Sequence, residues 1–77
     1  MSMGRDDLEA ALMEAHRLED GRRIAELYCE AGEQAEAAGQ SEQASFYFVH
    51  AYVFALQEGM DLADMLHARL KARGREA

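Results

Sequence analysis

Proline and tryptophan are absent from this chain, and cysteine occurs only once, at Cys29. The absence of proline, the strongest helix breaker, together with abundant alanine, glutamate, leucine and arginine, is typical of a helical globular protein. A single cysteine excludes a disulfide within the chain. Residues 1–7 lack the apolar core of a signal peptide, so we expect a cytoplasmic protein.

Long hydrophobic runs and basic residues are scarce as well. The most apolar stretch, Phe46–Leu56, is shorter than the roughly 20 apolar residues that span a bilayer. Lys and Arg number 8 against 15 Asp and Glu, which gives a formal net charge of −7, and the excess of acid lies within residues 1–42. Such a chain offers no basic surface to a phosphate backbone or an anionic membrane. The composition therefore argues against nucleic acid and membrane partners and favours cationic ones.

The length of the chain is that of one short domain. The 77 residues make a single helical domain, residues 1–77, whose ends at 1–5 and 74–77 we expect to fray. A single core in a chain of this size rarely supplies more than about 5 kcal/mol of stability. We therefore consider help from a second chain.

Apolar residues recur with helical spacing in four segments. We predict an all-α fold of four antiparallel helices, at about 6–19, 22–38, 42–58 and 61–73. Asp6, Ser41 and Asp61 are the expected N-caps. Gly39 and Gly59 are placed to end the second and third helices. The tight connection Asp20-Gly21 leaves open whether the first helix packs on its own chain or on another.

The last helix has two distinct faces. Its expected buried face consists of Leu62, Met65, Leu66 and Leu70, with Ala63 as a further candidate. Its C-terminal end is crowded with positive charge from Arg69, Lys71, Arg73 and Arg75. We expect these basic side chains to complement the helix dipole and to be solvated.

The third helix is the organising element, because it carries five of the six aromatic residues and no charge between Ser45 and Leu56. Its apolar positions surround it: Ala44, Phe48, Ala51 and Ala55 on one side, and Phe46, Val49, Val53 and Leu56 on much of the other. A helix that is apolar nearly all round must be covered nearly all round. We predict that the alanine side packs within the chain and that the remainder forms a homodimer interface. The predicted interface residues are Phe46, Val49, His50, Val53 and Phe54.

Residues 25–58 resemble one tetratricopeptide repeat. The motifs that carry the resemblance are Tyr28-x₂-Ala31-Gly32-x₂-Ala35, Gly39 at the turn, and Ala44-x₃-Phe48-x₂-Ala51. The match departs from the repeat where Tyr28 stands for tryptophan, where Ala31 and Ala35 replace larger residues, and where Leu56 replaces proline. The resemblance implies a right-handed array of helical hairpins with residues 61–73 as a capping helix. In such a hairpin, Phe48 fills the gap left by small residues on the facing helices.

The same resemblance implies a peptide groove lined by the second and fourth helices. Carried over to this sequence, its positions are Glu26, Cys29, Glu33 and Glu36, with Met60, Ala63, His67 and Leu70. Three glutamates in a groove favour a basic peptide, so an adaptor function is one alternative. The other interpretation is that these glutamates form the solvated face of an amphipathic helix.

Catalytic patterns are not evident, and we expect neither an enzyme nor a cofactor. Cys29 lies one helical turn from anionic Glu26 and Glu33, which favour the unreactive thiol over the thiolate. His16, His50 and His67 leave a metal or small-ligand site as a third alternative, although their spacing matches no known zinc or di-iron motif. For His50 two roles stay open: a hydrogen bond to a neighbour or to water, or the tuning of an interface near neutral pH.

Overall fold

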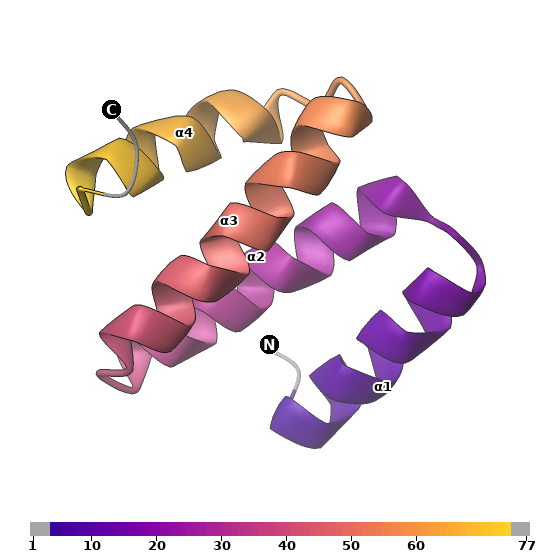
Figure 1. Ribbon diagram of the computed structural model, residues 1–77. Coiled ribbons are helices and arrows are strands. Elements are labelled where there is room, and N and C mark those ends of the chain that lie inside the picture. The colour runs from indigo at the N-terminus through magenta and orange to yellow at the C-terminus, as the bar shows by residue number, and fades with distance from the viewer. Residues whose placement is uncertain (1–3, 75–77) are drawn as a thin grey trace.

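The computed structural model of this protein describes residues 4–74, which form four α-helices joined by short turns (Figure 1). The helices are α1 (Arg5–Arg17), α2 (Gly21–Ala37), α3 (Ser41–Gln57) and α4 (Leu62–Ala72). The described part of the chain contains no strand. The predicted all-α class and the four helices are confirmed, with boundaries that differ from the prediction by one or two residues.

The first three helices end in the same type of turn. In each turn one residue adopts a left-handed backbone conformation: Glu19 (φ 54°), Gly39 (φ 77°) and Gly59 (φ 65°). The next backbone N–H then reaches back to a carbonyl of the helix at 2.9 Å, in the bonds Asp20 to Ala15, Gln40 to Ala35 and Met60 to Ala55. Glycine adopts this conformation freely, whereas a residue with a Cβ is strained in it. The turn at Glu19 is therefore the strained member of the set.

Helix starts differ from the prediction. Asp6 is not an N-cap, because α1 already begins at Arg5 and Asp6 lies in its first turn, where a carboxylate favours the helix dipole. Ser41 is the first residue of α3 rather than its cap, and Asp61 caps α4 without a side-chain hydrogen bond. Instead, Asp20 caps α2 by accepting a hydrogen bond from the Arg23 N–H at 3.1 Å. The ends expected to fray fall largely on residues 1–3 and 75–77, which lie outside the described residues.

The centre of the molecule is the hairpin of α2 and α3, with α1 against α2 and α4 across α3 (Figure 1). Phe48 of α3 is fully buried at the centre. A Cβ at position 32 of α2 would lie 2.5 Å from the Cε1 atom of Phe48, so only glycine admits this ring. The close approach expected between these two helices is present.

Most of the face predicted to be buried on α4 is buried. Leu66 and Leu70 are buried together with Ala63, and Leu62 packs against the core, whereas Met65 is 47% exposed. The buried residues follow the three-four spacing of one helix face, and Met65 lies outside it. None of the helices within residues 4–74 combines the length and hydrophobicity that crossing a membrane requires.

Candidate interaction surface

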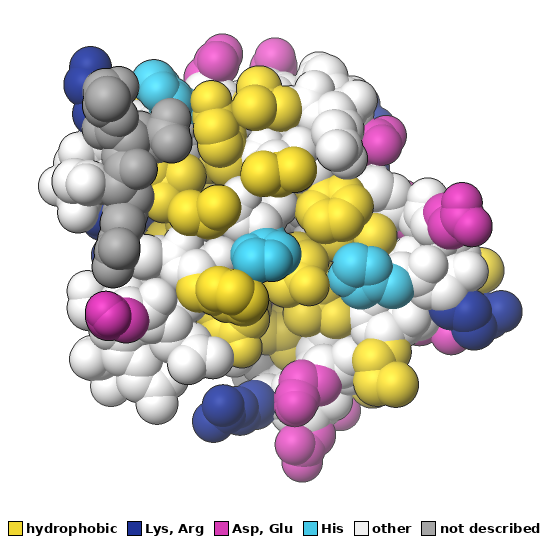
Figure 2. All heavy atoms as spheres, viewed as in Figure 1, with side chains coloured by type: hydrophobic (Ala, Val, Ile, Leu, Met, Phe, Trp, Pro, Cys, Tyr) yellow, Lys and Arg dark blue, Asp and Glu magenta, His cyan; other side chains and the backbone are white. Residues whose placement is uncertain are grey.

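Helix α3 exposes one apolar stripe. Its members Phe46, Val49, Val53 and Leu56 are between 40% and 56% exposed. They follow one another at intervals of three, four and three residues, which places them on one face of the helix. The other large side chains of α3 are buried or packed against the core: Tyr47, Phe48, Tyr52 and Phe54. Hydrophobic side chains gather over the middle of the face seen in Figure 2, with histidines among them.

The stripe has the spacing of a coiled-coil seam. Phe46, Val49, Val53 and Leu56 occupy positions equivalent to a, d, a and d of two heptads. A hollow of about 300 Å³ opens at one end of the stripe, lined by Glu42, Ser45, Phe46, Val49 and His50. Four of these residues have the i, i+3, i+4 and i+7 spacing of the holes into which side chains of a second helix insert. The spacing of this face is thus that of a helix-packing seam.

His50 borders the stripe in a fixed orientation. Its Nδ1 atom lies 2.9 Å from the carbonyl oxygen of Phe46, one turn earlier on the same helix. This contact assigns the proton of the neutral ring to Nδ1 and leaves a lone pair on Nε2. The ring centroid lies 4.3 Å from that of Phe46 and 5.2 Å from that of Tyr28. His50 therefore joins the exposed stripe to the aromatic residues beneath it.

Phe54 does not belong to the exposed stripe, in contrast to the prediction. It is half-buried, with its ring centroid 6.3 Å from Tyr28 and 5.9 Å from His16. Residues 46, 49 and 53 share one side of α3, and position 54 lies roughly a quarter turn away, facing α1. The other four predicted interface residues lie together on the surface.

Two neighbouring hollows beside α1 were not foreseen from the sequence. One is a pocket of about 230 Å³ that includes Leu8, Leu12, Ala35 and Tyr47. The other includes Met13, His16 and Tyr28, and Leu12 lines both hollows. Tyr28 lies at the centre of the aromatic contacts, which it makes with His16, Tyr47, His50 and Phe54. Its position as the sole aromatic residue before residue 46 was the available signal.

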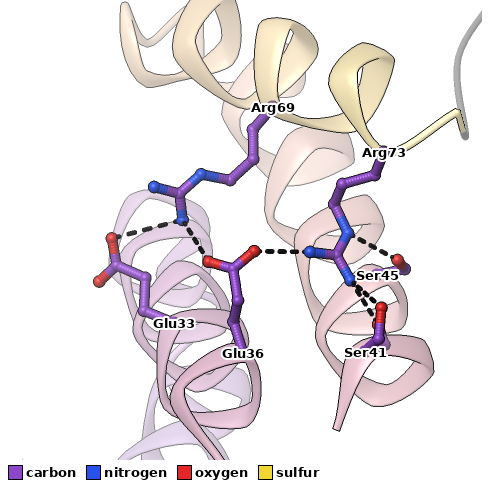
Figure 3. Close-up of polar contacts among 6 residues, drawn as sticks. All are labelled: Glu33, Glu36, Ser41, Ser45, Arg69 and Arg73. Carbon is purple, nitrogen blue, oxygen red and sulfur yellow. Dashed lines mark hydrogen bonds and ion pairs between the residues drawn. The ribbon is translucent and has the colours of Figure 1, made fainter. Parts of the chain in front are cut away.

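The acidic face of α2 is engaged by arginines of α4 (Figure 3). Arg73 Nη1 lies 2.6 Å from a carboxylate oxygen of Glu36, and Arg69 Nη1 lies 3.7 Å from Glu33 and 3.8 Å from Glu36. Arg73 also donates to Ser45 Oγ at 2.8 Å and to Ser41 Oγ at 2.9 Å. Both guanidinium groups lie over the Phe48 ring, at 4.9 and 5.7 Å from its centroid. These two arginines bind α2 and α3, so the expectation that they only solvate the helix end was wrong.

The positions predicted for a peptide groove do not line one open surface. Cys29, Ala63 and Leu70 are buried in the core. Glu33 and Glu36 already pair with arginine, and Glu26 is exposed beside Arg23 at 3.8 Å. The groove offsets of the repeat family therefore do not transfer to this chain, because α4 brings its own cations to the acidic face.

Cys29 is held as a thiol. Burial raises the pKa of its thiol first of all, and the nearby Glu33 carboxylate raises it further. Arg69 lowers this pKa to a smaller extent, and Glu30 raises it by less still. A raised pKa disfavours the thiolate that nucleophilic chemistry needs. Cys29 therefore lacks the environment of a reactive cysteine.

The three histidines are not gathered into one site. His16 and His50 each contact Tyr28, whereas His67 stacks on Tyr52 with a centroid distance of 5.7 Å. Within residues 4–74, no group of three or more His, Cys, Asp and Glu side chains is arranged to hold a metal ion.

Comparison with protein-family models, with curated proteins and with solved structures finds no match for this chain. The resemblance to a tetratricopeptide repeat stays a prediction, and the function must be argued from the surface itself.

Proposed function

We propose that this chain is a non-catalytic interaction module that associates with a second copy of itself through the apolar stripe of α3. The observation that carries the proposal is the exposure of Phe46, Val49, Val53 and Leu56 on one face of a helix whose other faces are covered. Contiguous apolar surface of this kind on a small domain marks an interaction site. The α2–α3 hairpin, with Phe48 lodged against Gly32, supports its description as a tetratricopeptide-like unit.

The heptad spacing of the stripe and its lack of charged residues favour a second copy of the chain as the partner. A seam with a/d spacing is self-complementary, because side chains of one helix fit the holes of an identical helix. Residues 43–57 carry no Asp, Glu, Lys or Arg, so two copies meet along this segment of α3 without burying such a side chain, despite a net charge of −7 on each. A cationic partner, by contrast, finds no acidic group among residues 43–57, and Glu42 borders the stripe at one end.

Sedimentation equilibrium tests the proposal by measuring the solution mass of the purified chain at a series of concentrations. We expect the wild-type chain to approach the mass of a dimer and the double variant Val49→Glu, Val53→Glu to remain a monomer. The control is Leu18→Glu, which changes an exposed leucine on the segment after α1, 58% accessible against 40% for Val49 and 44% for Val53. The control is expected to associate like the wild type.

Circular dichroism melts of all three proteins separate loss of association from loss of folding. The proposal requires the double variant to keep the helical spectrum of the wild-type monomer. A wild-type chain that stays monomeric up to millimolar concentration, where even a free energy of association of about −4 kcal/mol gives dimer, overturns the proposal.

A further inference from the structure

We infer that His50 makes the self-association dependent on pH, so that two copies hold together when its ring is neutral and separate when the ring gains a proton. This inference rests on the proposed function and adds a control to the same surface. His50 lines the hollow at the end of the stripe, together with Phe46 and Val49. His50 holds position e of the heptad, beside the seam, so a side chain of a second helix that enters this hollow contacts the His50 ring.

The fixed orientation of the ring decides what protonation does. Because Nδ1 is taken up by the Phe46 carbonyl at 2.9 Å, the additional proton goes to Nε2. The neutral ring brings only a lone pair into the covered seam, whereas the protonated ring brings a positive charge and an N–H donor. Burying such a charge without a partner is unfavourable, and the two copies each contribute one His50. Dissociation thus accompanies the uptake of two protons per dimer.

The ionisable groups around His50 do not offset this cost. From α2 it faces Tyr28, whose ring is 5.2 Å away, and the far neighbour of Tyr28 on α1 is His16, at a ring distance of 6.0 Å from Tyr28. On α3 itself Glu42 lines the same hollow, but eight residues of helix separate the two, about 12 Å along the axis. The Phe46 and Tyr28 rings attract a cation more strongly once water is excluded, but this gain is smaller than the cost of burying an unpaired charge.

The direction of the effect distinguishes His50 from the overall charge. Acidification towards the pI of about 4.8 reduces the net negative charge of each copy, which weakens repulsion and strengthens association. Protonation of His50 acts in the opposite direction. A dimer that weakens as the pH falls from 7 to 5 therefore points to a specific group that is neutral in the interface.

The test is the dissociation constant measured by sedimentation equilibrium between pH 8 and pH 5. For two linked protons the constant rises with falling pH by up to about a hundredfold per pH unit in the acidic part of this range. The variant His50→Gln is expected to lose this rise. The double variant His16→Gln, His67→Gln leaves His50 as the remaining histidine and is expected to keep it in full.

Failure of this inference and failure of the proposed function give different results. A chain that is monomeric at every pH removes the proposed function and the inference together. A wild-type dimer whose constant is unchanged or falls on acidification, or a pH response that disappears in His16→Gln, His67→Gln, leaves the dimer standing and overturns the role of His50. If His50→Gln does not associate at any pH, the double variant decides the question, because it leaves the stripe unaltered.

Discussion

The ring of Phe48 occupies the space that a side chain at position 32 would need, since a Cβ on Gly32 would lie 2.5 Å from its Cε1 atom. A glycine inside a helix costs about 1 kcal/mol relative to alanine, so this contact explains why the cost is tolerated. It joins the two longest helices at the point where the α4 arginines also meet the ring.

Replacing Gly32 with alanine is therefore expected to destabilise the protein although it improves helix propensity. Overpacking costs about 1–3 kcal/mol, and the gain in propensity returns about 1 kcal/mol, so a net loss of up to about 2 kcal/mol is expected. Urea unfolding followed by circular dichroism measures it. The double variant Gly32→Ala, Phe48→Leu removes the clash and should lose less than the two single changes added together. Simple additivity of the two changes would contradict this account.

Replacing Glu19 with glycine is expected to stabilise the protein. Glu19 has a φ of 54°, where Gly39 and Gly59 stand in the equivalent turns. We expect Glu19→Gly to raise the free energy of unfolding by about 0.5–1 kcal/mol, because the relief of left-handed strain, about 1–2 kcal/mol, exceeds the entropy that glycine adds to the unfolded chain. For a domain of this size the melting temperature then rises by about 2–8 °C. Glu19→Ala removes the same carboxylate but keeps a Cβ, so an equal gain from it would assign the effect to charge instead.

Most of the fold could be predicted from the sequence, because the features that determine it are local. Helical periodicity, Gly39 and Gly59 were enough for the four helices and two of the turns. The start of α1 was misplaced because Asp6 suits both an N-cap and the first turn, where the dipole favours it.

The surface was predictable only in part, because a sequence does not reveal which side of an apolar helix its neighbours cover. Phe46, Val49 and Val53 were expected on the outside and lie there, but Phe54 faces α1. The residues predicted for a peptide groove do not line one open surface because of a contact between residues far apart in the sequence. Arg73 and Glu36 are 37 residues apart, and no local pattern indicates that a cation from α4 reaches the acidic face of α2.

Two ion pairs of equal length allow the role of Arg73 to be measured. Arg73 contacts Glu36 at 2.6 Å with a side chain that is 15% exposed, and Arg17 contacts Glu14 at 2.6 Å with a side chain that is 68% exposed. Arg73 also donates to Ser41 and Ser45 and so links α4 to the start of α3, whereas Arg17 pairs within its own helix. The two substitutions to alanine remove the same chemical group from different surroundings.

We expect Arg73→Ala to lower the free energy of unfolding by about 1–3 kcal/mol, because a half-buried, charge-assisted network loses its donor while Ser45 stays buried. Arg17→Ala is expected to leave stability almost unchanged, since exposed ion pairs are screened by water and salt. Urea unfolding of both variants measures the difference, and hydrogen exchange of the α4 amides shows where it acts. If the two variants lose the same amount, or if exchange in α4 is not accelerated in Arg73→Ala, the arginine does not anchor the last helix, and its contacts with α2 and α3 contribute no more than an ordinary surface pair.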